Sequence, residues 1–288
     1  MAKEHRKTGL VMEGGAMRGL FTAGVLDVMM ENGIVFDGAI GVSAGAVFGC
    51  NYKSKQPGRA LRYNIRFHDE PRYCSFRSLI KTGDLFEADF CYRELPDRLD
   101  PFDRETYRAD PMPFYVVCTD VDRGTPFYYN AENGDGKDME WFRASASMPV
   151  FSRVVGIDGR HYLDGGISDP IPLRQFEKMG FGRNVVILTQ PEDYRKKKSF
   201  LLPVMSALLR EYPMTARAMN IRHLRYNSET EFVKKREEEG RAMVIRPPHP
   251  LGISRIERDP EKLTAVYETG RAVMGERLEE LRSFLRDT

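Results

Sequence analysis

The sequence predicts an α/β fold with a mostly parallel central sheet. Its first fifty residues alternate between strand and helix patterns, since apolar runs at residues 8–12 and 39–40 are each followed by a glycine-containing turn and a helical stretch. A strand–helix–strand order implies parallel strands joined by a right-handed crossover. A further apolar run at residues 184–189 is typical of a buried strand. With 288 residues, the chain is long enough to bury a substantial core.

The first turn lies in a glycine-rich loop. Gly14 and Gly15 follow the strand pattern, and from Met17 to Asn32 apolar residues recur at helical spacing. A glycine loop at the start of a helix can bind or stabilise negative charge through its backbone N–H groups. Its spacing does not match the dinucleotide-binding fingerprint, and no Gly-Lys-Ser/Thr of a P-loop follows. Two interpretations stay open, an oxyanion hole and a tight turn without chemistry.

The second turn matches the G-x-S-x-G nucleophile elbow. Gly41-Val42-Ser43-Ala44-Gly45 lies between an apolar run and an uncharged helical stretch. A strand-to-helix turn tight enough to project Ser43 tolerates only small neighbours. The helix after it offers free N–H groups and the positive end of its dipole to a developing oxyanion. Because chance matches to this pattern occur, it predicts a nucleophile only together with other features.

Residues 54–113 are predicted to form a helical insertion packed over the sheet. The segment has poor periodicity and carries 11 basic and 11 acidic residues. It also contains nine aromatic residues, which we expect to fill the core, since aromatic stripes usually do so. The alternative is an acyl-chain groove or lid beside Ser43. These aromatic residues are Tyr63, Phe67, Tyr73, Phe76, Phe86, Phe90, Tyr92, Phe102 and Tyr107.

A predicted hairpin at residues 154–163 turns at Asp158-Gly159 and leads into Asp164-Gly165-Gly166. An aspartate at the end of a strand, followed by two glycines, has an uncrowded carboxylate that can face a cleft. On this pattern alone an ordinary turn is favoured, because Asp-Gly pairs mark turns generally.

The remaining elements follow from periodicity and capping signals. An N-cap Asp259 followed by Pro260 predicts the start of a last helix reaching about Leu285. Residues 195–241 carry 12 basic and six acidic residues, so their net charge is +6. We expect solvated surface there, and a patch that approaches anionic lipid headgroups is the alternative. Further strands are expected at 114–121, 126–129 and 242–245, and helices at 139–147, 173–179, 200–209 and 214–239.

Taken together and in this order, these motifs resemble the patatin-like phospholipase family over residues 8–190. The resemblance extends to flanking stretches at residues 114–121, 144–149 and 169–172. It implies a three-layer α/β/α core with a mostly parallel sheet, in a single domain spanning 1–288 with a helical C-terminal region from about 195. It further implies that Ser43 is the nucleophile and Asp164 the base of a catalytic dyad. The implied oxyanion hole is Gly14, Gly15 and Ala16, with Arg18 in support.

Two residues depart from the usual pattern of that family. Ala16 replaces the third glycine of the loop, and Glu13 stands where many members carry Asp. Alanine keeps its N–H, so the oxyanion hole survives unless the backbone there needs a positive φ, which costs energy in a residue other than glycine. For Arg18 we favour orientation of the loop, with contact to a lipid phosphate and a structural salt bridge as alternatives.

The activity implied is that of a serine acyl hydrolase that cleaves carboxylic esters of lipids, like phospholipase A or a lysophospholipase, without a cofactor. One alternative is an esterase with a Ser-Asp-His triad, for which His223 and His249 follow Asp164 in the chain. A second is a lipid-binding or regulatory protein without turnover. The intact Ser43 and Asp164 argue against it.

Composition limits the remaining classes. The 44 basic and 42 acidic residues leave a net charge of +2, so nothing indicates nucleic-acid binding. The charged N-terminus has no apolar core of a signal peptide, and the longest uncharged stretch, residues 38–52, is too short to span a membrane. The four cysteines form no metal-binding spacing and are expected to be reduced. We therefore expect a cytoplasmic protein, with peripheral membrane contact as an added option. The sequence leaves its oligomeric state open.

Overall fold

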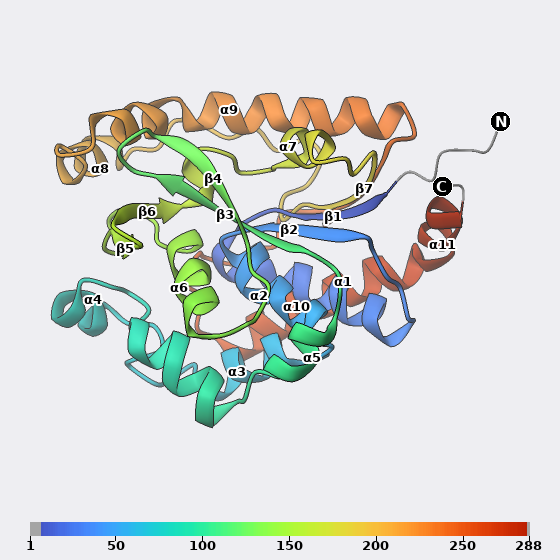
Figure 1. Cartoon of the computed structure of the whole chain (residues 1–288), viewed down its shortest axis with the longest axis horizontal. Coiled ribbons are helices and arrows are strands. Elements are labelled where there is room, and N and C mark those ends of the chain that lie inside the picture. Colours follow the sequence, from blue (N-terminus) through green and yellow to red (C-terminus); the bar gives the residue numbers. More distant parts are fainter. Residues whose placement is uncertain (1–6, 287–288) are drawn as a thin grey trace.

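The computed structural model describes residues 7–286 and is built around one eight-stranded sheet (Figure 1). The strands run in the order β5-β6-β3-β2-β1-β7-β8, and β4 pairs with β3. The neighbouring strands β3, β2, β1, β7 and β8 are all parallel, whereas β4 and β6 run antiparallel to β3. The mostly parallel sheet is thus confirmed. The strands are β1 (Thr8–Met12), β2 (Gly38–Val42), β3 (Phe114–Asp120), β4 (Thr125–Asn130), β5 (Val155–Ile157), β6 (Arg160–Asp164), β7 (Arg183–Ile187) and β8 (Ala242–Ile245).

Helices cover both faces of the sheet, which gives the three predicted layers. Every residue of β1 and β2 is buried, as expected of central parallel strands covered on both sides. In Figure 1 the long α9 and the short α7 lie on one side of the sheet, and α1, α2 and α10 lie on the other. These helices are α1 (Gly19–Glu31), α2 (Ala44–Lys53), α7 (Leu173–Lys178), α9 (Pro213–Glu238) and α10 (Pro260–Glu276).

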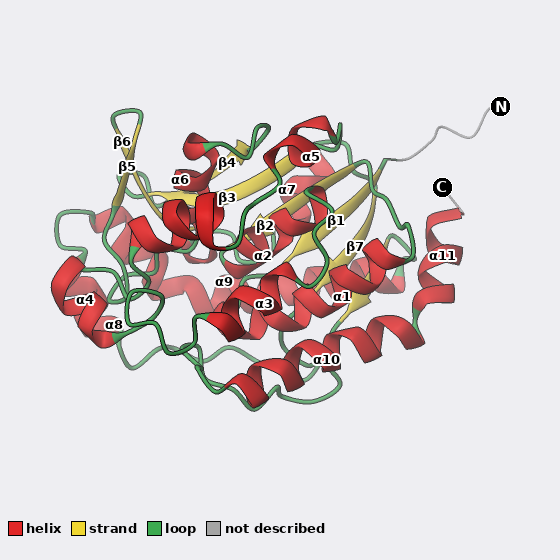
Figure 2. Ribbon diagram, turned by 90° about the horizontal axis from the view of Figure 1, so that it is seen from below, coloured by secondary structure: helices red, strands yellow, loops and turns green. Residues whose placement is uncertain are grey.

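The predicted insertion is helical and packs below the sheet, next to α1 and α2 (Figures 1 and 2). One of its helices, residues 90–99, is wound as a π-helix and contains Pro96, a distortion that the sequence did not predict. Arg59 is buried at the base of the insertion, where its Nη2 donates to the carbonyl of Asp100 at 2.6 Å and its Nη1 to Asn51 at 2.9 Å. The other helices there are α3 (Arg59–Arg66), α4 (Phe76–Thr82) and α5 (Arg104–Ala109).

Turn and capping patterns in the sequence predicted where most of the remaining elements begin or turn. The hairpin turns where predicted, since both Asp158 (φ 50°) and Gly159 (φ 75°) have the positive φ of a type I′ turn. The last helix does begin at the Asp259 cap, but the prediction of one continuous helix is wrong. The helix is interrupted at Arg277, whose guanidinium donates to the carbonyl of Val244 on β8. The remaining helices are α6 (Gly136–Ser145), α8 (Leu202–Leu208) and α11 (Leu278–Arg286).

A buried pair of carboxyl groups joins α9 to the core. Glu229 on α9 accepts a hydrogen bond from the backbone N–H of Ile171 at 2.8 Å, and Asp169 accepts one from the hydroxyl of Tyr128 at 2.5 Å. Burial, together with the negative charge of Asp169, raises the pKa of Glu229 far above its usual range. Glu229 is therefore protonated at neutral pH and donates to Asp169.

Replacing Glu229 with Gln should stabilise the fold at alkaline pH. When folding raises the pKa of an acid, the protein loses stability as the pH rises from the pKa in the unfolded chain toward the pKa in the folded one. Gln keeps both hydrogen bonds and does not ionise in the unfolded chain. We expect Glu229→Gln to raise the free energy of unfolding in urea by about 1 kcal/mol or more at pH 8, and by much less at pH 5.

Glu238→Gln is the matched control, because Glu238 is exposed on the same helix. If Glu229→Gln raised the free energy of unfolding equally at both pH values, this would contradict the conclusion that Glu229 is protonated.

Candidate functional site

Ser43 lies in the tight turn between β2 and α2. Its backbone has φ 54° and ψ −123°, a strained conformation for a residue other than glycine. The turn is held by Ser145, whose hydroxyl accepts from the Ser43 N–H at 2.9 Å and donates to the carbonyl of Val117 at 2.6 Å. The structure thus has the geometry of the predicted elbow, with the positive end of the α2 dipole at the Ser43 hydroxyl.

The glycine-rich loop passes directly beside this serine. A Cβ atom on Gly14 would lie 2.9 Å from the Cβ of Ser43 and 2.9 Å from the carbonyl of Val42, so only glycine fits there. Within residues 7–286, the N–H groups of Gly14 and Gly15 have no acceptor. Ala16 has φ 51°, and residues 16–18 form a 3-10 turn, so the first helix begins later than the predicted Met17. This leaves free N–H donors next to Ser43.

Asp164 ends β6 and lines the same cavity as Ser43. Its side chain is 2% exposed, and its Oδ1 accepts from the N–H of Gly166 at 2.7 Å. Burial raises the pKa of this carboxyl above its usual range. A hydrogen bond from the Ser43 side chain and the charges of nearby arginines oppose the rise. A carboxylate of raised pKa beside a serine hydroxyl is a stronger base than an exposed one.

Glu13 anchors the loop to two distant elements. One carboxylate oxygen accepts from the backbone N–H of Thr189 at 2.6 Å, and the other accepts from the hydroxyl of Tyr226 on α9 at 2.8 Å. Neither partner is predictable from the sequence, because no local pattern places residues 176 and 213 positions away next to Glu13. Glu13 thereby holds the glycine loop between β7 and α9.

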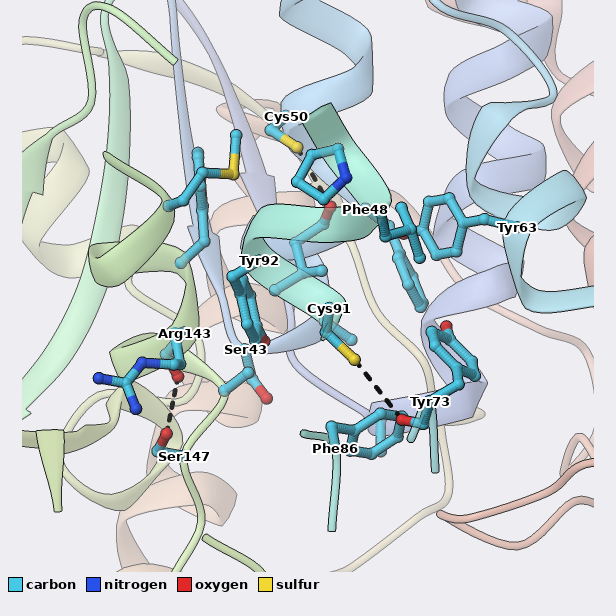
Figure 3. Close-up of a pocket in the computed structure, with 18 of the residues that line it drawn as sticks. Ser43, Phe48, Cys50, Tyr63, Tyr73, Phe86, Cys91, Tyr92, Arg143 and Ser147 are labelled. Carbon is cyan, nitrogen blue, oxygen red and sulfur yellow. Dashed lines mark hydrogen bonds between the residues drawn. The ribbon is translucent and has the colours of Figure 1, made fainter. Parts of the chain in front are cut away.

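Two cavities meet at Ser43, and one of them is largely apolar (Figure 3). The apolar cavity encloses about 1050 Å³ of space, including the open solvent at its mouth. Figure 3 shows Ser43 below the ring of Tyr92, with Phe48 and Tyr63 on the far side. Five of the nine insertion aromatics line this cavity, so they form a groove beside Ser43 as well as part of the core. They are Tyr63, Tyr73, Phe86, Tyr92 and Phe102.

The second cavity, which we call the polar cavity because several charged side chains line it beside apolar ones, contains the other predicted site residues. Gly14, Gly15, Ala16, Arg18 and Asp164 all line it together with Ser43. The Arg18 backbone N–H donates to the carbonyl of Gly15 at 3.3 Å, which closes the loop. Sequence reasoning had not placed Lys196, Arg222, Tyr226 or Arg255 at this site.

The histidines considered for a triad lie elsewhere. Among the described residues, neither cavity at Ser43 is lined by a histidine. His223 lines a neighbouring hollow, and His249 is exposed in a loop after β8. Within residues 7–286 there is also no group of three or more His, Cys, Asp or Glu side chains that could hold a metal ion. No helix in that range is long and apolar enough to cross a membrane.

Comparison with known proteins agrees with this geometry. A family model described as patatin-like phospholipase matches residues 10–177, which is more than half of the chain. The chain belongs to the patatin-like phospholipase family. A second model, described as a domain of unknown function (DUF6363), matches residues 212–286. The resemblance inferred from the motifs is therefore confirmed.

Similar proteins include several that differ in length from this chain. The uncharacterized protein YjjU of Escherichia coli K12 is 29% identical over 92% of this chain and 75% of its own length. An uncharacterized NTE family protein of Mycobacterium tuberculosis H37Rv is 25% identical over 58% of this chain, but the match covers only 44% of that protein. Lysophospholipase nte1 of Aspergillus oryzae is 23% identical over 96% of this chain and 18% of its own length. The solved structure of VipD from Legionella pneumophila aligns with 96% of this chain and 67% of its own at 13% identity and a TM-score of 0.48.

The positive φ of Ala16 predicts the outcome of one substitution. Ala16→Gly removes a left-handed strain of about 1 kcal/mol and keeps the N–H. We expect it to raise the free energy of unfolding by up to that amount and to leave hydrolysis of a short acyl ester within about twofold of wild type. Ala207→Gly on α8 is the control, since an exposed helical alanine should lose about 1 kcal/mol on the same change. A destabilised Ala16→Gly would contradict this account of the loop.

Proposed function

We propose that this protein is a serine acyl hydrolase that cleaves carboxylic esters of lipids through Ser43 and Asp164. The observation that supports it most is the position of Ser43 between an apolar cavity and a polar one that also holds Asp164 and the free N–H groups of the glycine loop. Membership of the patatin-like phospholipase family points to the same chemistry. We also propose that the chain forms one domain, because α9 covers the sheet and contacts the loop at Glu13.

The proposed reaction proceeds in two steps. Asp164 takes the proton of the Ser43 hydroxyl as the oxygen attacks the acyl carbonyl, and the N–H groups of Gly14, Gly15 and Ala16 stabilise the negative oxygen that forms. The alcohol leaves with the proton, and an acyl-enzyme remains on Ser43. Water then attacks this ester with Asp164 again as base, which releases the fatty acid and restores the serine.

The apolar cavity is suited to the acyl chain of the substrate. Most of its aromatic rings come from the insertion, and Phe48 on α2 together with Met139 and Phe142 on α6 completes the wall. Cys50 and Cys91 also line it, and burial raises the pKa of both thiols, so they are neutral and apolar at physiological pH. A chain seated there would leave its ester at Ser43 and its alcohol portion in the polar cavity.

We further propose that one end of the molecule contacts a lipid surface. Both α4 and α8 lie at that end (Figures 1 and 2), and each carries exposed apolar side chains. Ile80 on α4 is 87% exposed, and Phe200 just before α8 is 89% exposed. The chain runs from α4 into Phe86, which lines both cavities at Ser43. Exposed apolar side chains at this end of the molecule, together with the exposed Lys197 and Lys198, fit the interface of an anionic membrane.

The dyad is tested by substituting the serine and the aspartate separately. A fluorophosphonate should label Ser43, and Ser43→Ala should lose both the labelling and the hydrolysis of short acyl esters. Asp164→Asn keeps the shape and the Gly166 hydrogen bond but cannot take a proton, so turnover should fall about 10²–10⁴-fold. In the wild type, activity should be lost on acidification at a pH above the usual range of an aspartate, because the base must be ionised and its pKa is raised.

Two matched variants serve as controls for the dyad. Ser152 lines both cavities and His249 is exposed, so Ser152→Ala and His249→Ala should keep most of the activity. Labelling of Ser152 in place of Ser43 would overturn the assignment of the nucleophile. Loss of activity in folded His249→Ala or His223→Ala would favour a triad.

Membrane contact is tested with vesicles that contain anionic phospholipid. The double variant Ile80→Ser, Phe200→Ser should bind them at least about tenfold more weakly than wild type, because each apolar side chain contributes about 1.5 kcal/mol or more on burial. Val35→Ser is the control, since Val35 is 69% exposed but lies between α1 and β2. Equal binding of the double variant and the wild type would remove this surface from the proposal.

A further inference from the structure

The polar cavity at Ser43 is lined by more cationic side chains than the steps of the proposed hydrolysis require. Four cationic side chains line it, whereas its acidic residues are Glu13 and Asp164 alone. Both carboxylates are already engaged, Glu13 by Thr189 and Tyr226 and Asp164 by Gly166. The cavity therefore carries an excess of positive charge. The cationic residues are Arg18, Lys196, Arg222 and Arg255.

None of these four side chains forms an ion pair with a carboxylate among the described residues, where ion pairs are otherwise frequent. The Nε of Arg18 is buried and has no hydrogen-bond acceptor. Arg222 donates only to the backbone carbonyl of Gly166. The Nζ of Lys196 lies 4.4 Å from the centre of the Tyr226 ring, and Arg255 is solvent-exposed at the edge of the cavity. Their donors are thus free to receive an anion.

The four cations also destabilise one another. Burial, and then the charges of Arg222, Arg255 and Arg18, lower the pKa of Lys196 to about 7, with Glu13 acting in the opposite direction. Burial likewise lowers the pKa of Arg222, the charge of Asp164 opposes this effect, and the charge of Arg255 adds to it. Holding such a group together without a counter-ion costs free energy, and a bound anion would remove that cost.

We propose that this cavity binds the phosphate group of the substrate, so that the preferred ester is an anionic, phosphate-bearing lysolipid. This inference rests on the proposed function, since the acyl chain would occupy the apolar cavity and the ester would lie at Ser43 between the two. Guanidinium groups bind phosphate oxygens through paired hydrogen bonds, and a lysine adds a point charge. The phosphate would then lie on the alcohol side of the ester.

Three of the four cations lie outside the segment that matches the patatin-like family. Lys196 falls between the two matched segments, and Arg222 and Arg255 fall within residues 212–286, the domain of unknown function. Arg222 comes from α9 and Arg255 from the loop between β8 and α10. The inference therefore assigns a role to the C-terminal segment, which is recognition of the phosphate at an active site whose nucleophile lies elsewhere in the chain.

The test compares two soluble esters that differ only in the phosphate, 1-octanoylglycerol 3-phosphate and 1-octanoylglycerol. Wild type should have the higher kcat/KM for the phosphate ester, and Arg255→Gln and Lys196→Gln should each lower the ratio of the two kcat/KM values about tenfold. The ratio is the readout because Arg255 also influences Asp164, which would affect both esters alike. Arg210→Gln, on the exposed segment after α8, removes the same charge outside the cavity and should not change the ratio.

Binding without turnover separates the lipid headgroup from free phosphate. In Ser43→Ala, calorimetric titration should show 1-octanoylglycerol 3-phosphate binding more tightly than inorganic phosphate, and Arg255→Gln in that background should weaken both. Equal affinity for the two would overturn the assignment to a lipid substrate.

The two proposals fail in different ways. A wild type that hydrolyses neither ester contradicts the proposed function. Hydrolysis of both esters with a ratio that Arg255→Gln and Lys196→Gln leave unchanged contradicts only the phosphate site.

Discussion

The close approach between the turn at Ser43 and the strand β1 determines the geometry of the whole site. A Cβ atom on Gly45 would lie 2.5 Å from the carbonyl of Met12 and 2.7 Å from that of Glu13, so the first turn of α2 packs directly on the backbone that leads into the glycine loop. The loop and Ser43 are therefore positioned by a backbone contact between neighbouring parallel strands, to which the side chains of Ser145 and Glu13 add hydrogen bonds. Asp164 reaches the same point because β6 pairs with β3 next to β2.

Electrostatics at this point is balanced between opposing effects. Burial raises the pKa of Asp164 and so strengthens it as a base, while the cations around it limit that rise. Without Arg222 and Arg255 the pKa of this carboxyl would be raised further, and with less burial it would be raised less. The same cations that we propose to hold the substrate phosphate thus also oppose the rise in the pKa of Asp164, so the proposed substrate recognition and the proposed general-base strength depend on shared groups.

Local patterns in the sequence were enough to predict the strand–helix–strand start of the core, the elbow at Ser43 and the Asp158-Gly159 hairpin, because each depends on residues close together in the chain. The sequence raised a positive φ at Ala16 only as a possibility, because the conformation there depends on how β1 packs against α2. Arg255 and Tyr226 gave no signal at all. Tyr226 contacts Glu13 from a position 213 residues further along the chain. Within the pattern of its helix, nothing distinguishes this tyrosine from any other. Contacts of that kind follow from the assembled fold and leave no periodic trace.

The double anchoring of Glu13 has a consequence for how such chains can be divided. Thr189 lies just beyond the segment matched by the patatin-like family, and Tyr226 lies inside the domain of unknown function. A chain cut near residue 190 would keep Ser43, Asp164 and every glycine of the loop, yet the buried carboxylate of Glu13 would lose the Tyr226 hydroxyl that accompanies it. The two matched segments are accordingly not interchangeable modules. Both contribute residues to the site at Ser43, and an exchange of the C-terminal segment between relatives would have to carry that tyrosine with it.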